Sequence, residues 1–284
     1  MSISFLSWNI DRKKNFEEEI SRLVLDEEIE ADILLLIEAE NVDDSLIESY
    51  TKLKRIFVND GRETNLTPRF YSNLSIDEFQ LVEIHDTKRI TFARLNIDGQ
   101  EEIIVGGVHL PSKLECNSET QFKDARRISL DLKTMKDRKD IGHNRFLLLG
   151  DFNMNPFEPG MIEPDAFNAV LSADEALNNQ RTDWYKKYDY FYNPMWSFMG
   201  DRNYITGERK LPGSYYFRKT RDVTLTYWNV FDKVILRPSL INLLDYKSLR
   251  IIEKNNIETL INDDYSLKDE AYSDHLPITF KMNL

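Results

Sequence analysis

Residues 146–153 read FLLLGDFN, an apolar run of four residues followed by Gly150, Asp151 and Asn153. A short apolar run that is bounded by polar or turn residues predicts a buried β-strand. Five more segments share this pattern, and they are Ile3–Asn9, Ile33–Ile37, Ile103–Val108, Val230–Leu236 and Leu276–Phe280. The chain is therefore predicted to contain buried strands that begin or end beside polar side chains.

Two amphipathic stripes lie between these strands. The first is formed by Phe16, Ile20, Leu23 and Val24. The second is formed by Phe122, Ala125, Ile128, Leu132 and Met135. Spacings of three and four residues are those of one helix face. Ser118, with Gln121 three residues later, predicts a capping box at the start of the second helix.

The segments 79–84, 90–97 and 103–108 read as an antiparallel meander, with Asp98-Gly99 as a hairpin turn. Strands and helices mix throughout the chain, which predicts the α/β class with much antiparallel pairing. No repeat and no Pro/Gly-rich linker interrupts the sequence. Residues 1–284 are therefore expected to form a single domain.

The composition is that of a globular protein, with 41% hydrophobic and 30% charged residues. No apolar run approaches the roughly 20 residues that span a bilayer, and the N-terminal residues lack the pattern of a secretory signal. Cys116 is the single cysteine, which excludes an intrachain disulfide and a cysteine-rich metal site. We expect a cytoplasmic monomer without a membrane segment.

The formal net charge of −12 argues against non-specific coating of nucleic acid, but the charge is uneven. Residues 1–50 hold 14 acidic and 4 basic side chains, whereas the segments 121–139 and 204–222 are net positive. Each positive segment is read either as solvated surface or as part of a face that meets a phosphate-bearing substrate. The region 184–231 holds 15 of the 33 aromatic residues. It is read either as core packing or as a platform that stacks flat groups.

Polar side chains lie at the ends of the predicted strands or within them. Because uncompensated carboxylates are costly to bury, they suggest one shared polar site. Oxygen donors of this kind prefer Mg²⁺ or Mn²⁺ to zinc, and a divalent ion beside histidines suits phosphoryl transfer. The side chains concerned are Asn9, Asp11, Glu38, His109, Asp151, Asn153, Asp232, Asp274 and His275.

In order and content, these motifs resemble the endonuclease/exonuclease/phosphatase superfamily of metal-dependent phosphoesterases. The resemblance implies a four-layer α/β/β/α sandwich, in which two mixed β-sheets pack face to face between helices. It also implies an Mg²⁺ (or Mn²⁺) cofactor of one or two ions. The matching pieces are SWNID at 7–11, the strand 33–38, VHL at 108–110, GDFN at 150–153, FDKVIL at 231–236 and SDHLPI at 273–278.

The resemblance also implies roles for single residues. Asn9 and Glu38 correspond to the main metal-binding pair, with Asp11 near the metal and Asp274 as a second carboxylate on the metal side. Glu40 is a rival to Glu38, although it lies beyond the strand and lacks the motif match.

The remaining motif residues correspond to catalytic groups. Asp151 and Asn153 match the pair that positions or activates the attacking water, and His109 matches a donor to the phosphate oxygens. His275, oriented by Asp232, matches the histidine that contacts the phosphate or serves as base. The resemblance leaves open whether Asp151 or His275 is the base.

The sequence departs from the family's usual pattern in two places, and one further residue bears on the branch of the superfamily. Ile37 stands where the family usually has glutamine. Arg12, Lys13 and Lys14 follow the first motif in place of glycine, either to reach substrate phosphate or as a solvated lead-in to a helix. His109 resembles the deoxyribonuclease, phosphatase and tyrosyl-DNA phosphodiesterase branches, whereas apurinic-site endonucleases have tyrosine there.

The leading functional hypothesis is a magnesium-dependent phosphodiesterase that acts on DNA or RNA. The alternative is a small-molecule phosphatase or phosphodiesterase whose substrate is an inositol phosphate or a phospholipid head group, since the charge of −12 suits a small substrate better than a long polyanion. The candidate substrate contacts are Arg126, Arg127, Tyr215, Tyr216, Arg218 and Trp228.

Overall fold

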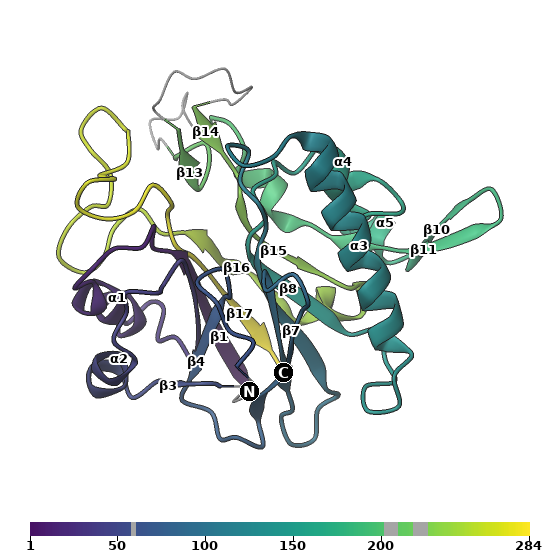
Figure 1. Ribbon diagram of the computed structural model, residues 1–284, viewed down its shortest axis with the longest axis horizontal. Helices are drawn as coiled ribbons and strands as arrows, with labels where there is room; N and C mark the ends of the chain where they lie inside the picture. The colour runs from purple at the N-terminus through teal and green to yellow at the C-terminus, as the bar shows by residue number, and fades with distance from the viewer. Residues whose placement is uncertain (58–60, 202–209, 218–226) are drawn as a thin grey trace.

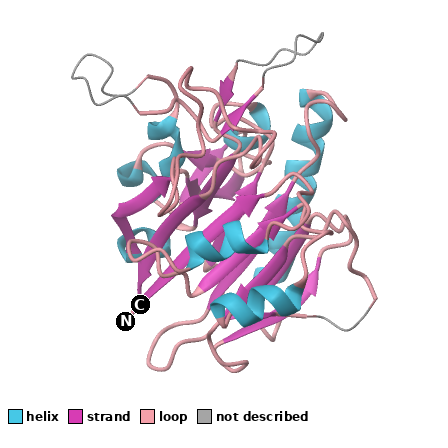
Figure 2. Cartoon of the chain, turned by 90° about the vertical axis from the view of Figure 1, so that its left-hand side faces the viewer, coloured by secondary structure: helices cyan, strands magenta, loops and turns pink. Residues whose placement is uncertain are grey.

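The strand patterns fold into two mixed β-sheets that face each other, with helices on both outer sides (Figure 1, Figure 2). The structure is a computed structural model that describes residues 1–57, 61–201, 210–217 and 227–284. The layered arrangement confirms the α/β/β/α sandwich that the sequence predicted.

The first sheet is built around β1 (Ser2–Asn9). This strand pairs antiparallel with β17 (Ile278–Asn283) and parallel with β2 (Ile33–Ile37). The sheet continues beyond β17 to β16 (Leu244–Ile251), and beyond β2 to β4 (Arg69–Ser72) and β3 (Lys54–Arg55). Strands from both ends of the chain therefore meet in its centre.

The second sheet contains seven strands. Its central strands are β7 (Ile103–His109), β8 (Phe146–Asp151) and β15 (Asp232–Leu236). Since β7 and β8 are parallel and in register, His109 lies opposite Asp151 where both strands end. The outer strands are β5 (Phe79–Ile84) and β6 (Ile90–Leu95) beyond β7, and β12 (Phe191–Tyr192) and β9 (Ala169–Val170) beyond β15.

Side chains from the two inner sheet faces form the central core. Phe5 and Leu35 of the first sheet belong to one buried cluster with Val105, Leu147 and Val234 of the second. Successive side chains of a strand point to opposite faces, so the alternate residues of the same strands serve the two outer layers. Strands buried on both faces explain why the sequence shows continuous apolar runs.

Helices cover both outer faces. On the first sheet, α1 (Glu17–Val24) and α2 (Asp44–Thr51) pack through Ile20, Leu23 and Ile47. On the second, α3 (Ser118–Lys136) packs through Ala125, Ile128, Leu132 and Met135. The short elements are α4 (Pro159–Ile162), α5 (Ala173–Ala176), η1 (Pro194–Phe198), η2 (Pro238–Leu243) and the strand pairs β10 (Gln180–Asp183) with β11 (Lys186–Asp189) and β13 (Tyr215–Tyr216) with β14 (Trp228–Asn229). None of the described helices is long and apolar enough to cross a membrane.

The start of α3 corrects one expectation. The N-cap is Asn117, whose extended backbone lets its Oδ1 accept a hydrogen bond from the Thr120 amide at 2.9 Å. Ser118 is the first helical residue, so the expected capping box is wrong. The Gln121 side chain points inward and donates to the carbonyls of Pro111 and Asn153. Two strands of the site also begin later than expected, since β15 begins two residues after Val230 and β17 two residues after Leu276.

The aromatic region 184–231 serves several purposes. Phe191 and Tyr192 are strand residues buried in the core, whereas Trp184 and Tyr185 are strongly exposed. Tyr215 is buried beside the polar strand ends. Most of the basic segment 204–222 lies outside the described residues.

Candidate active site

The polar residues predicted from the strand ends meet at one edge of the sandwich. Asn9 ends β1, Glu38 follows β2, and His109 and Asp151 end β7 and β8. Asp232 opens β15 opposite Asp151, with which it is in register. Asp274 and His275 lie a few residues before β17, and Asn153 follows β8. The fold thus brings together segments that are up to 267 positions apart, as the hydrogen bond from Trp8 Nε1 to the His275 carbonyl shows.

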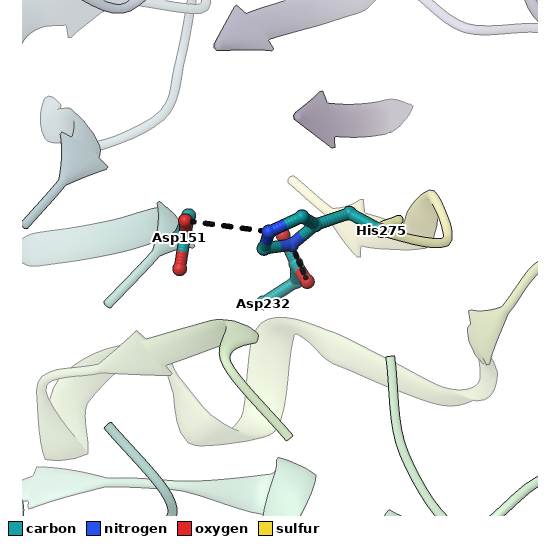
Figure 3. A group of neighbouring side chains, drawn as sticks. All are labelled: Asp151, Asp232 and His275. Carbon is teal, nitrogen blue, oxygen red and sulfur yellow. Dashed lines mark hydrogen bonds and ion pairs between the residues drawn. The ribbon is translucent and has the colours of Figure 1, made fainter. Parts of the chain in front are cut away.

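Asp232 and His275 form a buried pair, which Figure 3 shows with its neighbour Asp151. His275 Nδ1 lies 2.8 Å from Asp232 Oδ2. Ser214 Oγ donates to the same carboxylate oxygen at 2.8 Å and accepts from the Asp232 amide at 3.1 Å. Asp232 therefore holds the imidazole with Nε2 directed to Asp151, at 3.8 Å from its Oδ2. Although burial opposes it, the charges of Asp232 and Asp151 raise the pKa of His275 well above its usual value.

Asp151 is the hub of the buried polar network. Its Oδ2 accepts hydrogen bonds from Asn9 Nδ2 at 3.1 Å and Asn153 Nδ2 at 2.8 Å, and its Oδ1 accepts from the Asn153 amide. Burial raises the pKa of Asp151. The charge of His275 opposes this increase, and the charge of Asp232 adds to it. Three donors and a nearby imidazole thus compensate a carboxylate with almost no exposed surface.

Glu38 lies beside this network and is contacted on both carboxylate oxygens. Its Oε1 is 3.3 Å from His109 Nε2, and its Oε2 is 3.0 Å from Arg12 Nε. The same Arg12 nitrogen lies 3.2 Å from Glu40 Oε1, so one guanidinium bridges both candidate glutamates. Burial would raise the pKa of Glu38, but the hydrogen bond and charge of His109, followed by Arg12, lower it to about 2.

The acidic side chains around Glu38 fit a divalent cation. Burial raises the pKa of Asp274 to about 6; His275 opposes this, and the negative charges of Asp11, Glu38 and Asp151 add to it. Carboxylates that disfavour one another's charge in this way are stabilised by a cation, and oxygen donors suit Mg²⁺ or Mn²⁺. Among the described residues, the group whose ligand atoms all lie within 4.8 Å of one another is Asp151, Asp232 and His275. That group could hold a metal ion by its geometry, whereas the fit of Asp11, Glu38 and Asp274 rests on their charges.

The described candidate substrate contacts lie on three elements of the fold, β13, β14 and α3. The ring of Tyr215 lies 4.5 Å from that of His275, and burial raises the pKa of its hydroxyl. Tyr216 of β13 packs against Trp228 of β14, with 5.0 Å between the centres of the two rings. Arg126 forms an ion pair with Asp165 at 2.8 Å, and Arg127 is exposed on α3. Arg218 lies outside the described residues.

Several supporting residues were not predicted. Trp8 and Ser273 lie inside motifs that the sequence displays, and Ser273 Oγ ties the segment to β1 by donating to the Asn9 carbonyl at 2.7 Å. Ser214, which supports Asp232, lies in no recognisable motif, and Gln121, which holds the Asn153 carbonyl, was predicted only as part of a capping box. Only the folded structure reveals those two partners.

Solved structures with the same arrangement cover nearly the whole chain. An endonuclease/exonuclease/phosphatase family protein from Bacteroides thetaiotaomicron is 12% identical, with a TM-score of 0.54 over 99% of this chain and 98% of that one. TDP2 from D. rerio, complexed with a single-strand DNA product, is 15% identical, with a TM-score of 0.52 over 100% and 99%. Beta toxin from Staphylococcus aureus with bound magnesium ions is 15% identical, with a TM-score of 0.53 over 99% of both chains.

These likenesses show that the chain has the endonuclease/exonuclease/phosphatase fold, which confirms the resemblance at the level of architecture. No protein-family model and no curated protein matches the sequence.

Proposed function

We propose that the chain is a metal-dependent phosphoric ester hydrolase that cleaves phosphodiester bonds in nucleic acid. The observation that carries this proposal is the joining of two arrangements at one edge of the fold. A buried His275 is oriented by Asp232 and faces Asp151, and a group of acidic side chains lies beside them. Phosphoryl transfer needs both a positioned proton carrier and a means of neutralising phosphate charge.

Asn9, Asp11, Glu38 and Asp274 are the residues that would hold Mg²⁺ or Mn²⁺, as one or two ions. The bound metal would neutralise negative charge on the scissile phosphate. We assign the trio of Asp151, Asp232 and His275 to proton handling, because the 2.8 Å bond to Asp232 already occupies His275 Nδ1.

The chain's own side chains supply the remaining steps. His109, next to Glu38, would donate to a phosphate oxygen as negative charge develops there. Two carboxylates favour a proton on His275, which suits a contact between its Nε2 and the phosphate. Asp151 then remains to orient the attacking water and accept its proton, while Asn153 fixes the carboxylate.

One comparison favours nucleic acid as the substrate. A protein of the same fold, TDP2 from D. rerio, was solved with a single-strand DNA product. The net charge of −12 supports the alternative, a small phosphate ester such as an inositol phosphate or a phospholipid head group.

A magnesium-titrated hydrolysis panel tests the proposal. It would offer single- and double-stranded DNA, RNA, a 5′-phosphotyrosyl oligonucleotide, inositol phosphates and a generic phosphodiester. Glu38→Ala should abolish hydrolysis, whereas the matched Glu40→Ala should retain most of it. An active, folded Glu38→Ala protein would remove the metal assignment.

The salt dependence separates the two substrate classes. Hydrolysis of an oligonucleotide should weaken steeply as salt rises, because binding releases counterions. Cleavage of inositol phosphates alone, with a shallow salt dependence, would replace the nuclease by the small-molecule enzyme.

A further inference from the structure

A free-standing hairpin projects from the second sheet. Its strands β10 and β11 pair only with each other, from Gln180 opposite Asp189 to Asp183 opposite Lys186 (Figure 1). The base is firmly held. Lys136 of α3 pairs with the Asp189 carboxylate at 2.7 Å, and Arg237 donates to the Asp189 carbonyl at 3.0 Å. The hairpin is thus anchored at its base and solvated at its tip.

The tip carries two aromatic side chains that contribute nothing to the core. Trp184 is 84% exposed and Tyr185 is 97% exposed, the two largest values among the large hydrophobic residues that the structure describes. Together they form the two-residue turn between Asp183 and Lys186.

The backbone at this turn is strained. Trp184 has a φ of 52°, in the left-handed region that two-residue hairpin turns usually give to Gly, Asn or Asp. A bulky side chain with this φ is unusual and unfavourable. A strained backbone that presents an exposed aromatic pair indicates a role outside the fold itself.

The tip is flanked by basic side chains. Arg181, Lys186 and Lys187 are exposed, and none of them forms an ion pair with any residue in the described part of the chain. Asp183 is the one acidic residue between Gln180 and Tyr188. Although the net charge of the chain is −12, these three basic side chains make the tip of the hairpin locally positive and complementary to an anionic surface.

We infer that the hairpin docks on an anionic lipid surface. Trp184 and Tyr185 enter the headgroup region, and Arg181, Lys186 and Lys187 contact the lipid phosphates. Tryptophan and tyrosine favour the membrane–water interface because each joins an apolar ring to a polar group. Basic side chains add attraction to anionic lipids.

The shape of the tip favours lipid over nucleic acid. Single-stranded nucleic acid is bound in a groove whose cations follow the backbone and whose rings stack successive bases. Here two adjacent rings form the convex end of a hairpin. A convex apolar tip with basic side chains behind it suits the deformable surface of a lipid bilayer. The inference is independent of the proposed hydrolysis, since no residue of the candidate active site takes part.

Cosedimentation of the full chain with vesicles tests this inference. One set of vesicles contains phosphatidylcholine alone, and the other contains about one third phosphatidylserine. We expect binding to the second set. Replacing Trp184→Gly and Tyr185→Asn together should abolish it, and these residues suit the turn, so the hairpin remains folded. Lys186→Ala with Lys187→Ala should weaken binding roughly thirtyfold.

The matched control removes two exposed apolar side chains elsewhere, by Ile76→Ala and Ile257→Ala, which are 66% and 68% exposed. Binding of this variant should equal that of the unchanged chain. The inference is overturned if the unchanged chain does not sediment with either set, or if the turn variant binds as well as the unchanged chain. A turn variant that loses only binding to a single-stranded oligonucleotide would assign the hairpin to nucleic acid instead.

Discussion

Lys233 is a fully buried lysine and the second residue of β15, next to Asp232, and its replacement is predicted to change how stability depends on pH. Its Nζ donates to the carbonyls of Met154 at 2.6 Å and Phe231 at 2.9 Å, and lies 5.1 Å from the centre of the Phe152 ring. Burial lowers the pKa of Lys233 from its ordinary 10.5 to about 7, against the attraction of Asp151 and Asp232.

The sign of the effect follows from proton binding. Between pH 7 and pH 10.5 the unfolded chain keeps the Lys233 proton, whereas the folded chain releases it. The free energy of unfolding therefore rises with pH in this window. Each pH unit changes the free energy of unfolding by at most about 1.4 kcal/mol. Lys233 should therefore raise the free energy of unfolding by about 2 kcal/mol between pH 7 and pH 9.

Urea denaturation at several pH values measures this gain. Lys233→Met removes the titrating group at similar volume, and the difference in unfolding free energy between the unchanged chain and this variant isolates its contribution. The difference should grow in favour of the unchanged chain by about 2 kcal/mol from pH 7 to pH 9. Parallel stability curves would refute the reasoning, because they would mean that Lys233 keeps its proton in the folded state.

Three more predictions concern the site and its support. Arg12→Gln should bind Mg²⁺ more tightly, by up to about fivefold in isothermal titration, since the guanidinium no longer competes for Glu38 Oε2; an unchanged affinity would speak against the competition. Asp232→Asn should lower the hydrolysis rate by roughly thirtyfold, because about 2 kcal/mol from the charged hydrogen bond to His275 is lost. The same variant should lower the pKa of His275 in an NMR titration. A rate like that of the unchanged chain would contradict this prediction. Gly150→Ala should destabilise the fold by at least about 2 kcal/mol in urea denaturation, because Gly150 has a φ of 127° and an added Cβ would lie 2.3 Å from the Val108 carbonyl oxygen; wild-type stability would be inconsistent with this geometry.

Much of the fold could be predicted because its central strands are buried on both faces. Ile33–Ile37 is a strand with the bounds that its apolar run indicated. Asp151 follows such a run, and parallel pairing with β7 places it opposite His109. A polar residue that ends a buried strand is therefore informative, because the register of the sheet decides which other strand ends it meets.

Other features depend on contacts that sequence spacing does not encode. Ser214 reaches Asp232 from a loop without a motif, and Arg12 bridges two glutamates between which the sequence offered a choice. The turn at Trp184 lacks the Gly or Asn that usually marks a two-residue hairpin turn in a sequence. No local pattern therefore predicted β10 and β11. The roles assigned to the site residues stay predictions until hydrolysis is measured.

The position of β1 between β2 and β17 has a consequence for biosynthesis. A ribosome makes β1 some 270 residues before its antiparallel neighbour β17, and His275 comes just before β17. Until these residues have left the exit tunnel, Asp232 and Asp151 have no imidazole between them and β1 has an open edge. The candidate active site is therefore incomplete while the chain is being translated, and one edge of β1 stays unpaired until β17 has been made.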